Sequence, residues 1–314
     1  MKTYDFYNSL IHQGYLPVRV LGYNYIDWFL NITPEFKSEF EYEVDSNDLK
    51  KSIKYNINRK PIVDIAHIND KHEIEIFENY CQFLWSCSYS FFVIFDEGVH
   101  KPTLDKTFTG NFLDVSNNYI NTAVEHFRSG ISLFKSYRED IFYRLPNPEK
   151  YDDNNKFYIE RTSGIYTAAM TFILLHEFAH QYYGHVITPA DDEQSKKDEY
   201  LADEYAFDQM STHFEKGDGQ TYKCGILVGL CSLTFFDDSL RGGNRHPDPD
   251  DRILNLIEKM YLNELDNLCC VATIALNLWA IEFNKELKYA KQVENYKVLF
   301  YETFEQLKAQ KGNC

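Results

Sequence analysis

The sequence has no apolar run long enough to form a membrane-spanning helix. Its two most apolar stretches are CQFLWSCSYSFFVIF, residues 81–95, and LCCVATIALNLWAI, residues 268–281. Both fall short of the roughly 20 apolar residues that a helix needs to cross a bilayer. The N-terminal segment also lacks the apolar core and the small-residue cleavage site of a signal peptide. We therefore expect two buried core elements and a cytoplasmic protein.

Basic residues are scarce relative to acidic ones. The chain has 32 Lys and Arg against 48 Asp and Glu, which gives a net charge of −16. Nucleic acids and anionic lipids attract basic surfaces, so this balance disfavours generic binding to either, although a local basic patch stays open. We expect no nucleic-acid partner and no membrane span.

Cysteine pairs of the CxxC type are missing as well. The seven cysteines are scattered, apart from the adjacent Cys269 and Cys270. A zinc knuckle requires paired thiolates at short spacing, and a chain of this size does not depend on a disulfide framework. We expect free, buried thiols.

The chain does have ample material for a hydrophobic core. Of its 314 residues, 44% are hydrophobic, and the 24 Tyr and 24 Phe argue against disorder. No linker is long enough to separate two independent domains, so we expect a single, mainly helical α+β unit over residues 1–314. Residues 1–155 read as a mixed portion with a small sheet, whose role the sequence leaves open. Residues 156–314 read as a helical portion that carries the chemistry.

Apolar patterning places the main elements. Strand-like runs lie at 17–30 and 60–70, and residues 156–160 fit a short strand. Residues 72–92 fit a helix, whose end SFFVIF stays open between helix and strand. An amphipathic helix capped by Ser116 or Asn117 fits residues 116–136. Further helices are expected at 165–183, 196–214, 221–240, 249–263, 264–286 and 288–310.

The stretch LLHEFAHQYYGH, residues 174–185, contains the pattern HExxH inside an apolar helix. His176 and His180 are four residues apart and therefore project from the same helix face, where two imidazoles can hold one Zn²⁺. Glu177 points about 100° further around the helix, beside the metal, where it can take a proton from water. Chance and a satisfied pair of core histidines are the alternative. Burying two His and one Glu without partners would be costly, which weighs against that alternative.

The third ligand is open between His185 and Glu199. The arrangement HExxHxxGxxH would need glycine and histidine where this chain has Tyr183 and Val186. His185 lies beyond the helix end, which Gly184 is well placed to terminate. We do not expect His185 to fold back onto the site, and we assign it to the carbonyl end of the helix.

Glu199 is the better candidate because it lies 19 residues after His180 on a second predicted helix. Asp203 follows four residues later on the same face, where it could accept the spare imidazole N–H of a ligating histidine. The small Ala202 and Ala206 would let this helix approach the first closely. The alternative for Glu199 is a solvated surface acid.

At this point the motifs resemble a known group. HEFAH followed by EYLAD, residues 199–203, resembles the gluzincins, zinc metallopeptidases with two His and one Glu as ligands. NRHPDPDDRI, residues 244–253, resembles the histidine–proline block of the M48-like peptidases. The resemblance implies a zincin-like domain and a zinc cofactor. It also implies that His246 stabilises an oxyanion and that Arg252 pairs with Glu199 or Asp203. HPDPDD also fits a turn and a helix start, and both interpretations can hold together.

The resemblance covers residues 165–255 and leaves the rest of the chain unmatched. Many M48-like proteins carry membrane helices or a secretion signal, and this sequence shows neither. Two soluble gluzincin-like families remain: the U49 phage-exclusion proteases of the Lit type and the regulator-cleaving ImmA type. The length, the acidity and a motif past mid-chain favour the phage-exclusion type.

These observations predict a zinc-dependent metalloprotease that acts on a protein or peptide substrate. Zinc would be held by His176, His180 and Glu199, with Glu177 as general base and His246 as helper. A zinc-stabilised binding protein that no longer cleaves, and hydrolysis of a small non-peptide substrate, stay open as alternatives. A cytoplasmic protease needs restraint, which narrow specificity or an activating partner would provide. The oligomeric state and the substrate stay open.

Overall fold

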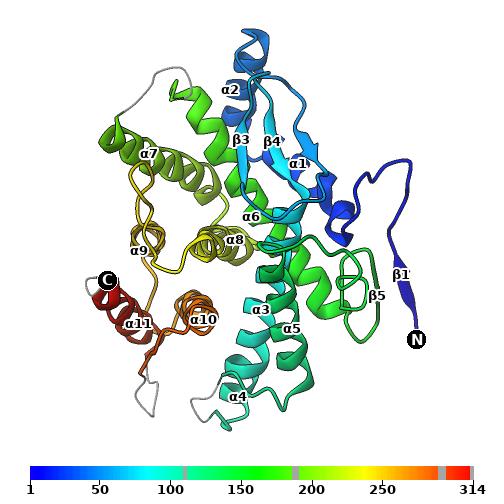
Figure 1. The fold of residues 1–314 in the computed structure, drawn as a ribbon, viewed down its shortest axis with the longest axis vertical. Helices are drawn as coiled ribbons and strands as arrows, with labels where there is room; N and C mark the ends of the chain where they lie inside the picture. Colours follow the sequence, from blue (N-terminus) through cyan, green and yellow to red (C-terminus); the bar gives the residue numbers. More distant parts are fainter. Residues whose placement is uncertain (109–111, 186–190, 289–294, 312–314) are drawn as a thin grey trace.

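A computed structural model describes residues 1–108, 112–185, 191–288 and 295–311. It shows the expected α+β fold, mainly helical with small sheets in the N-terminal half (Figure 1). The helices are α1 Gly22–Leu30, α2 Pro34–Asp45, α3 Glu78–Phe95, α4 Lys101–Leu104, α5 Asn118–Ser132, α6 Lys156–Tyr182, α7 Asp192–Ser211, α8 Gly219–Leu233, α9 Pro249–Lys259, α10 Asn267–Glu282 and α11 Tyr296–Lys311.

Helix α6 is the centre of the molecule. It contacts α1, α3, α7, α8 and strand β3, and Figure 1 shows it running through the middle of the fold. Most of its residues are buried, because apolar side chains occupy nearly every face of the helix. The helix that carries HExxH is therefore held on several sides before any metal is considered.

Helix α8 crosses α6 at very short range. An added Cβ on Gly225 of α8 would lie 2.3 Å from Cβ of Ala168 on α6. The two backbones can approach this closely only because the contact residues are small.

Two small sheets flank this helical core. Strand β1 (Thr3–Asp5) pairs antiparallel with β5 (Lys150–Asp152). The other sheet has the order β2–β4–β3, with β2 (Lys54–Asn56) parallel to β4 (Ile74–Phe77) and β3 (Ala66–Ile68) antiparallel to it. All four residues of β4 are buried, and β3 and β4 pack on α6. The predicted small N-terminal sheet is thus confirmed.

Two strand predictions were wrong. Residues 17–30 form a 3₁₀ turn at Pro17–Leu21 and then α1. The buried side chains of α1, Tyr25 and Phe29, are four residues apart, which is helical spacing. Residues 156–160 are the first turn and a half of α6. In both segments the β-branched and aromatic composition suggested a strand, and burial on one helix face prevailed.

The predicted helices are present with shifted ends, except that residues 74–77 at the start of the predicted helix 72–92 form strand β4. Residues 289–294 of the predicted helix 288–310 lie outside the described ranges. Asn117 caps α5, since its side chain accepts hydrogen bonds from the backbone N–H groups of Tyr119 and Ile120. SFFVIF continues α3 as helix. The six cysteines in the described ranges are free, and five of them are buried. Within those ranges, no helix combines the length and the hydropathy needed to span a bilayer.

Candidate metal centre and the cleft above it

Three helices position the predicted site residues. His176, Glu177 and His180 lie in the last two turns of α6, Glu199 and Asp203 lie on α7, and Arg252 lies on α9. Helix α6 ends sharply after His180 because Gly184 adopts φ +73°. Gly184 N–H then donates to the carbonyl of Gln181, and His185 N–H donates to that of His180, both at 2.9 Å. The chain can leave the site at once and return as α7.

The three predicted ligands converge on one point. The Nε2 atoms of His176 and His180 are 3.1 Å apart. Glu199 Oε2 lies 3.5 Å from Nε2 of His176, and Glu199 Oε1 lies 3.6 Å from Nε2 of His180. Donors at the corners of a zinc tetrahedron are about 3.3 Å apart if each bond is about 2.0–2.1 Å. The three side chains could therefore hold one small divalent cation.

Asp203 and Arg252 contact two of the predicted ligands, His176 and Glu199. Asp203 Oδ1 lies 3.0 Å from Nδ1 of His176, although the angle is not that of a well-directed hydrogen bond. Arg252 donates through Nε and Nη2 to both oxygens of Asp203, each at 2.7 Å, and its Nη1 lies 3.1 Å from Glu199. Asp203 is fully buried and Arg252 is 8% exposed. The bidentate geometry fixes both carboxylates where the imidazoles need them.

The local charges favour a cation at the convergence point. Burial alone would raise the pKa of Glu199, but His176, His246 and Arg252 outweigh it and hold that pKa well below its ordinary value. Burial would likewise lower the pKa of His176, yet Asp203 and Glu199 raise it well above its ordinary value. Two ionised acids thus draw positive charge to the point where the ligand atoms meet.

Glu177 lies beside this point, on the wall of a cleft. Burial raises the pKa of its carboxyl to about 8, and the carboxylates of Glu199 and Asp64 act in the same direction. This pKa lies near neutral pH, the range in which a carboxyl can both accept and return a proton.

His246 comes from the loop that precedes α9. Its Nδ1 lies 3.2 Å from Oε1 of Glu199, and its side chain is 64% exposed. The imidazole therefore lies at the mouth of the site with one edge against a ligand and the rest open to solvent.

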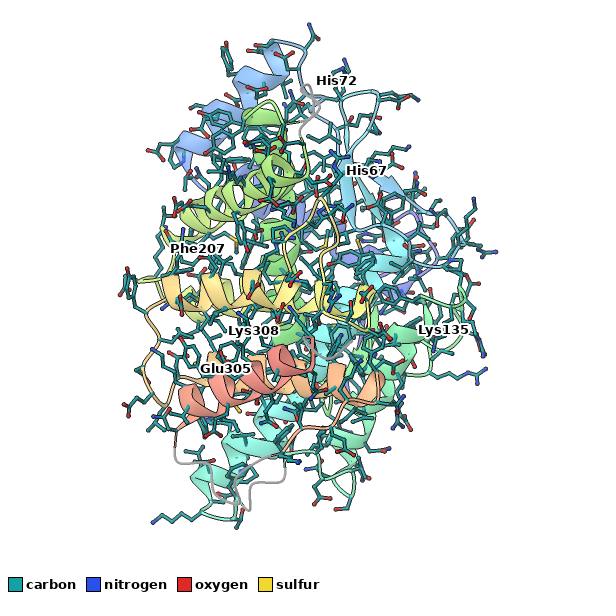
Figure 2. All side chains as sticks on the ribbon, turned by 60° about the vertical axis from the view of Figure 1, so that its left-hand side comes forward. His67, His72, Lys135, Phe207, Glu305 and Lys308 are labelled. Atoms are coloured by element: carbon teal, nitrogen blue, oxygen red, sulfur yellow. The ribbon has the colours of Figure 1, made fainter. Side chains whose placement is uncertain are left out.

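The cleft above the site has a volume of about 510 Å³. The residues that line it come from the β3 segment, from α6 and α8, and from the loop before α9. They include Asp64, His67, Phe172, Ile173, Gly229, Leu233, Phe236, Arg241 and Pro247. Figure 2 shows His67 in the region of the small sheet. A long, partly apolar cleft of this volume can accept a stretch of extended peptide.

Comparison with protein families gives a match that includes the candidate ligands, Glu177, His246 and the Asp203–Arg252 pair, whereas Asp64 and His67 lie outside it. The model of the Peptidase U49 family matches residues 74–274. The chain belongs to this family. Comparison with curated proteins and with solved structures returned no match. Membership of the U49 family implies peptidase activity and a protein substrate. The matched range includes α3 and α5–α9, whereas α1, α2 and α11 lie outside it.

One prediction about this U49 peptidase site needs correction. The backbone of His185 closes the helix end as expected, but its side chain does fold back. Its Nδ1 lies 3.1 Å from Nδ1 of His180, and its Nε2 lies 3.5 Å from Asp198. Because His185 contacts the ring nitrogen of His180 that faces away from the convergence point, it orients a ligand and does not join the ligand set.

The sequence did not point to Asp64, His67 or Arg241. Nδ1 of His67 lies 2.7 Å from Asp64, and both residues line the cleft together with Arg241. An Asp and a His three residues apart are too common to mark a site. Only the packing of β3 against α6 brings this pair to the cleft.

Proposed function

We propose that this U49 peptidase is a zinc-dependent metallopeptidase that cuts a peptide bond in a protein substrate. The convergence of His176, His180 and Glu199 beneath the cleft, with Glu177 beside them, carries the proposal. When bound there, zinc would activate water and polarise a scissile carbonyl.

The residues of the chain then have distinct roles. Glu177 accepts the proton of the attacking water and passes it to the leaving amine. His246 offers an imidazole at the mouth of the site to stabilise the oxyanion. Arg252 and Asp203 keep Glu199 and His176 in place during the reaction. A role in phage exclusion or in regulation is part of this proposal and rests on the Lit-type resemblance.

The variant Glu177→Gln tests the mechanism. We expect it to bind zinc as the wild type does and to lose activity by about 10²–10⁴-fold, because the amide cannot accept a proton. Both proteins would be incubated with host-cell lysate, and new peptide termini would be mapped by mass spectrometry. Termini that appear equally with both proteins would overturn the mechanism.

Zinc coordination separates the enzyme from a zinc-stabilised binding protein that no longer cleaves. X-ray absorption of the zinc-loaded protein should show three protein ligands and an open position. Four protein ligands would favour the binding protein. Phage plating on cells that express wild type or Glu177→Gln tests the exclusion role separately.

A further inference from the structure

The C-terminal end of helix α11 forms ion pairs with the segment that carries His246. Nζ of Lys311 lies 3.0 Å from Oδ2 of Asp248 and forms a second ion pair with Asp250. The side chain of Lys311 is only 12% exposed and that of Asp250 is 1% exposed. This contact joins residues about 60 positions apart in the chain, one of which is fully buried.

The segment that Lys311 contacts, residues 241–250, forms a tight loop that leads into α9. The N–H of Gly242 donates to Oδ1 of Asp248 at 2.9 Å, which closes the loop. A Cβ on Gly242 would lie 2.0 Å from the carbonyl oxygen of Pro247, so the two arms of the loop are in direct contact. Asp248 precedes α9 but makes no capping hydrogen bond to it. Its carboxylate instead joins the loop closure to Lys311.

A second contact ties the opposite arm of the loop to the same residue. Arg241 Nη2 donates to the main-chain carbonyl of Lys311 at 2.5 Å. Arg241 and His246 both line the cleft. Lys311 therefore holds one arm through its side chain and the other through its backbone. Figure 2 shows α11 beside α9, and Lys308 adds an outer ion pair to Asp251 at 3.4 Å.

The buried carboxylate of Asp250 requires a cation at position 311. Its Oδ1 pairs with Lys311, and it is buried at the start of α9. A buried carboxylate without its counter-ion costs several kcal/mol in proteins, and the surrounding segment would have to move to hydrate it. Asp248, Asp250 and Asp251 lie close together, and each of them pairs with Lys311 or Lys308.

We propose that Lys311 is a positioning residue for the active site, because it holds residues 241–250 so that His246 and Arg241 face the cleft. This inference rests on the proposed function. Lys311 lies outside the range that the U49 family model matches.

The variant Lys311→Met tests the proposal, with Lys308→Met as the matched control. Met retains most of the side-chain volume and removes the charge. Lys308 lies on the same helix and pairs with an acid, but that pair is half exposed. We expect Lys311→Met to speed hydrogen exchange of the Gly242 amide by about tenfold or more, since opening of the loop exposes it. Zinc content should stay that of the wild type, because the ligands lie on α6 and α7. Lys308→Met should leave both unchanged.

Rescue and activity complete the test. Lys311→Arg should retain most of the protection, and Asp250→Asn in the Lys311→Met background should restore part of it by removing the buried charge. Formation of the termini mapped in lysate should slow for Lys311→Met at unchanged zinc content. Exchange equal in Lys311→Met and Lys308→Met, or no rescue, would overturn the inference. If wild type cuts nothing in lysate, the proposed function fails, and the exchange data still decide whether Lys311 holds the loop.

Discussion

One carboxylate, that of Glu199, links every part of the candidate site. It lies within 3.1–3.6 Å of side-chain nitrogen atoms of His176, His180, His246 and Arg252. Such a buried acid is tolerable only while its partners remain, because an unpaired buried charge costs far more than a broken surface pair. The arginine is therefore as important to this site as the ligands themselves.

Replacing Arg252 by Met should destabilise the protein strongly. The change removes the bidentate partner of the buried Asp203 and one partner of the buried Glu199, which we expect to cost about 3–5 kcal/mol in the free energy of unfolding. Urea denaturation of the metal-free protein, followed by circular dichroism, would measure it.

Lys259→Met is the matched control, since this residue of the same helix pairs with Glu204 at a partly exposed position. We expect that loss to stay below about 1 kcal/mol. Equal losses for the two variants would contradict the importance given to burial.

At the scale of elements, the close crossing with α8 holds α6, the helix that carries His176 and His180, in place. Position 225 requires glycine because an added Cβ would clash with Ala168. A Cβ added to Gly164 of α6 would instead lie 3.6 Å from its nearest neighbour, Cγ2 of Thr221, which is an ordinary contact. The two helical glycines therefore differ in packing, and the same substitution should act on them in opposite directions.

We expect Gly225→Ala to lower the free energy of unfolding by about 1–3 kcal/mol, because the added methyl clashes with Ala168. Gly164→Ala should raise it by up to about 1 kcal/mol through helix propensity alone. Thermal unfolding of both variants would measure the difference. Stabilisation by both substitutions would show that the helices can separate without loss.

The sequence predicts some elements of this fold well, for physical reasons. The HExxH pair needs only local helix geometry, so His176, Glu177 and His180 follow from spacing. Glu199 required a resemblance as well as a spacing, since it lies 19 residues after His180 on a separate helix. The parallel pairing of β2 with β4, the helical state of residues 17–30 and the return of His185 to His180 depend on contacts between distant segments. Local patterns carry no record of such contacts.

At the scale of the whole molecule, acid should weaken the fold through a histidine remote from the cleft. His126 of α5 is fully buried, and its Nε2–H donates to the carbonyl of Pro146 at 2.7 Å. Burial lowers the pKa of this imidazole to about 4, from 6.5. Below pH 6.5 the unfolded chain binds a proton at His126 that the folded protein does not bind. As the pH falls from 6.5 to about 4, this difference lowers the free energy of unfolding, and below about pH 4 the contribution of His126 levels off.

The variant His126→Gln should flatten that dependence, because glutamine does not titrate. The difference in unfolding free energy between variant and wild type should change by about 3 kcal/mol between pH 6.5 and pH 4. Urea denaturation at several pH values would measure it. The comparison cancels the contributions of the other buried histidines, and parallel curves for the two proteins would contradict the assignment.

The pairing of β1 with β5 has a consequence for how the chain is made. Tyr4 pairs with Tyr151, so β1 has no partner strand until Tyr151 has been synthesised. At about 5–20 residues per second, that wait lasts roughly 7–30 s. During this time a nascent N-terminus that carries Tyr4, Phe6 and Tyr7 is free to meet chaperones or neighbouring chains. The β1–β5 ribbon on the N-terminal side of the fold can therefore form only after β5 has been synthesised, long after β1 itself.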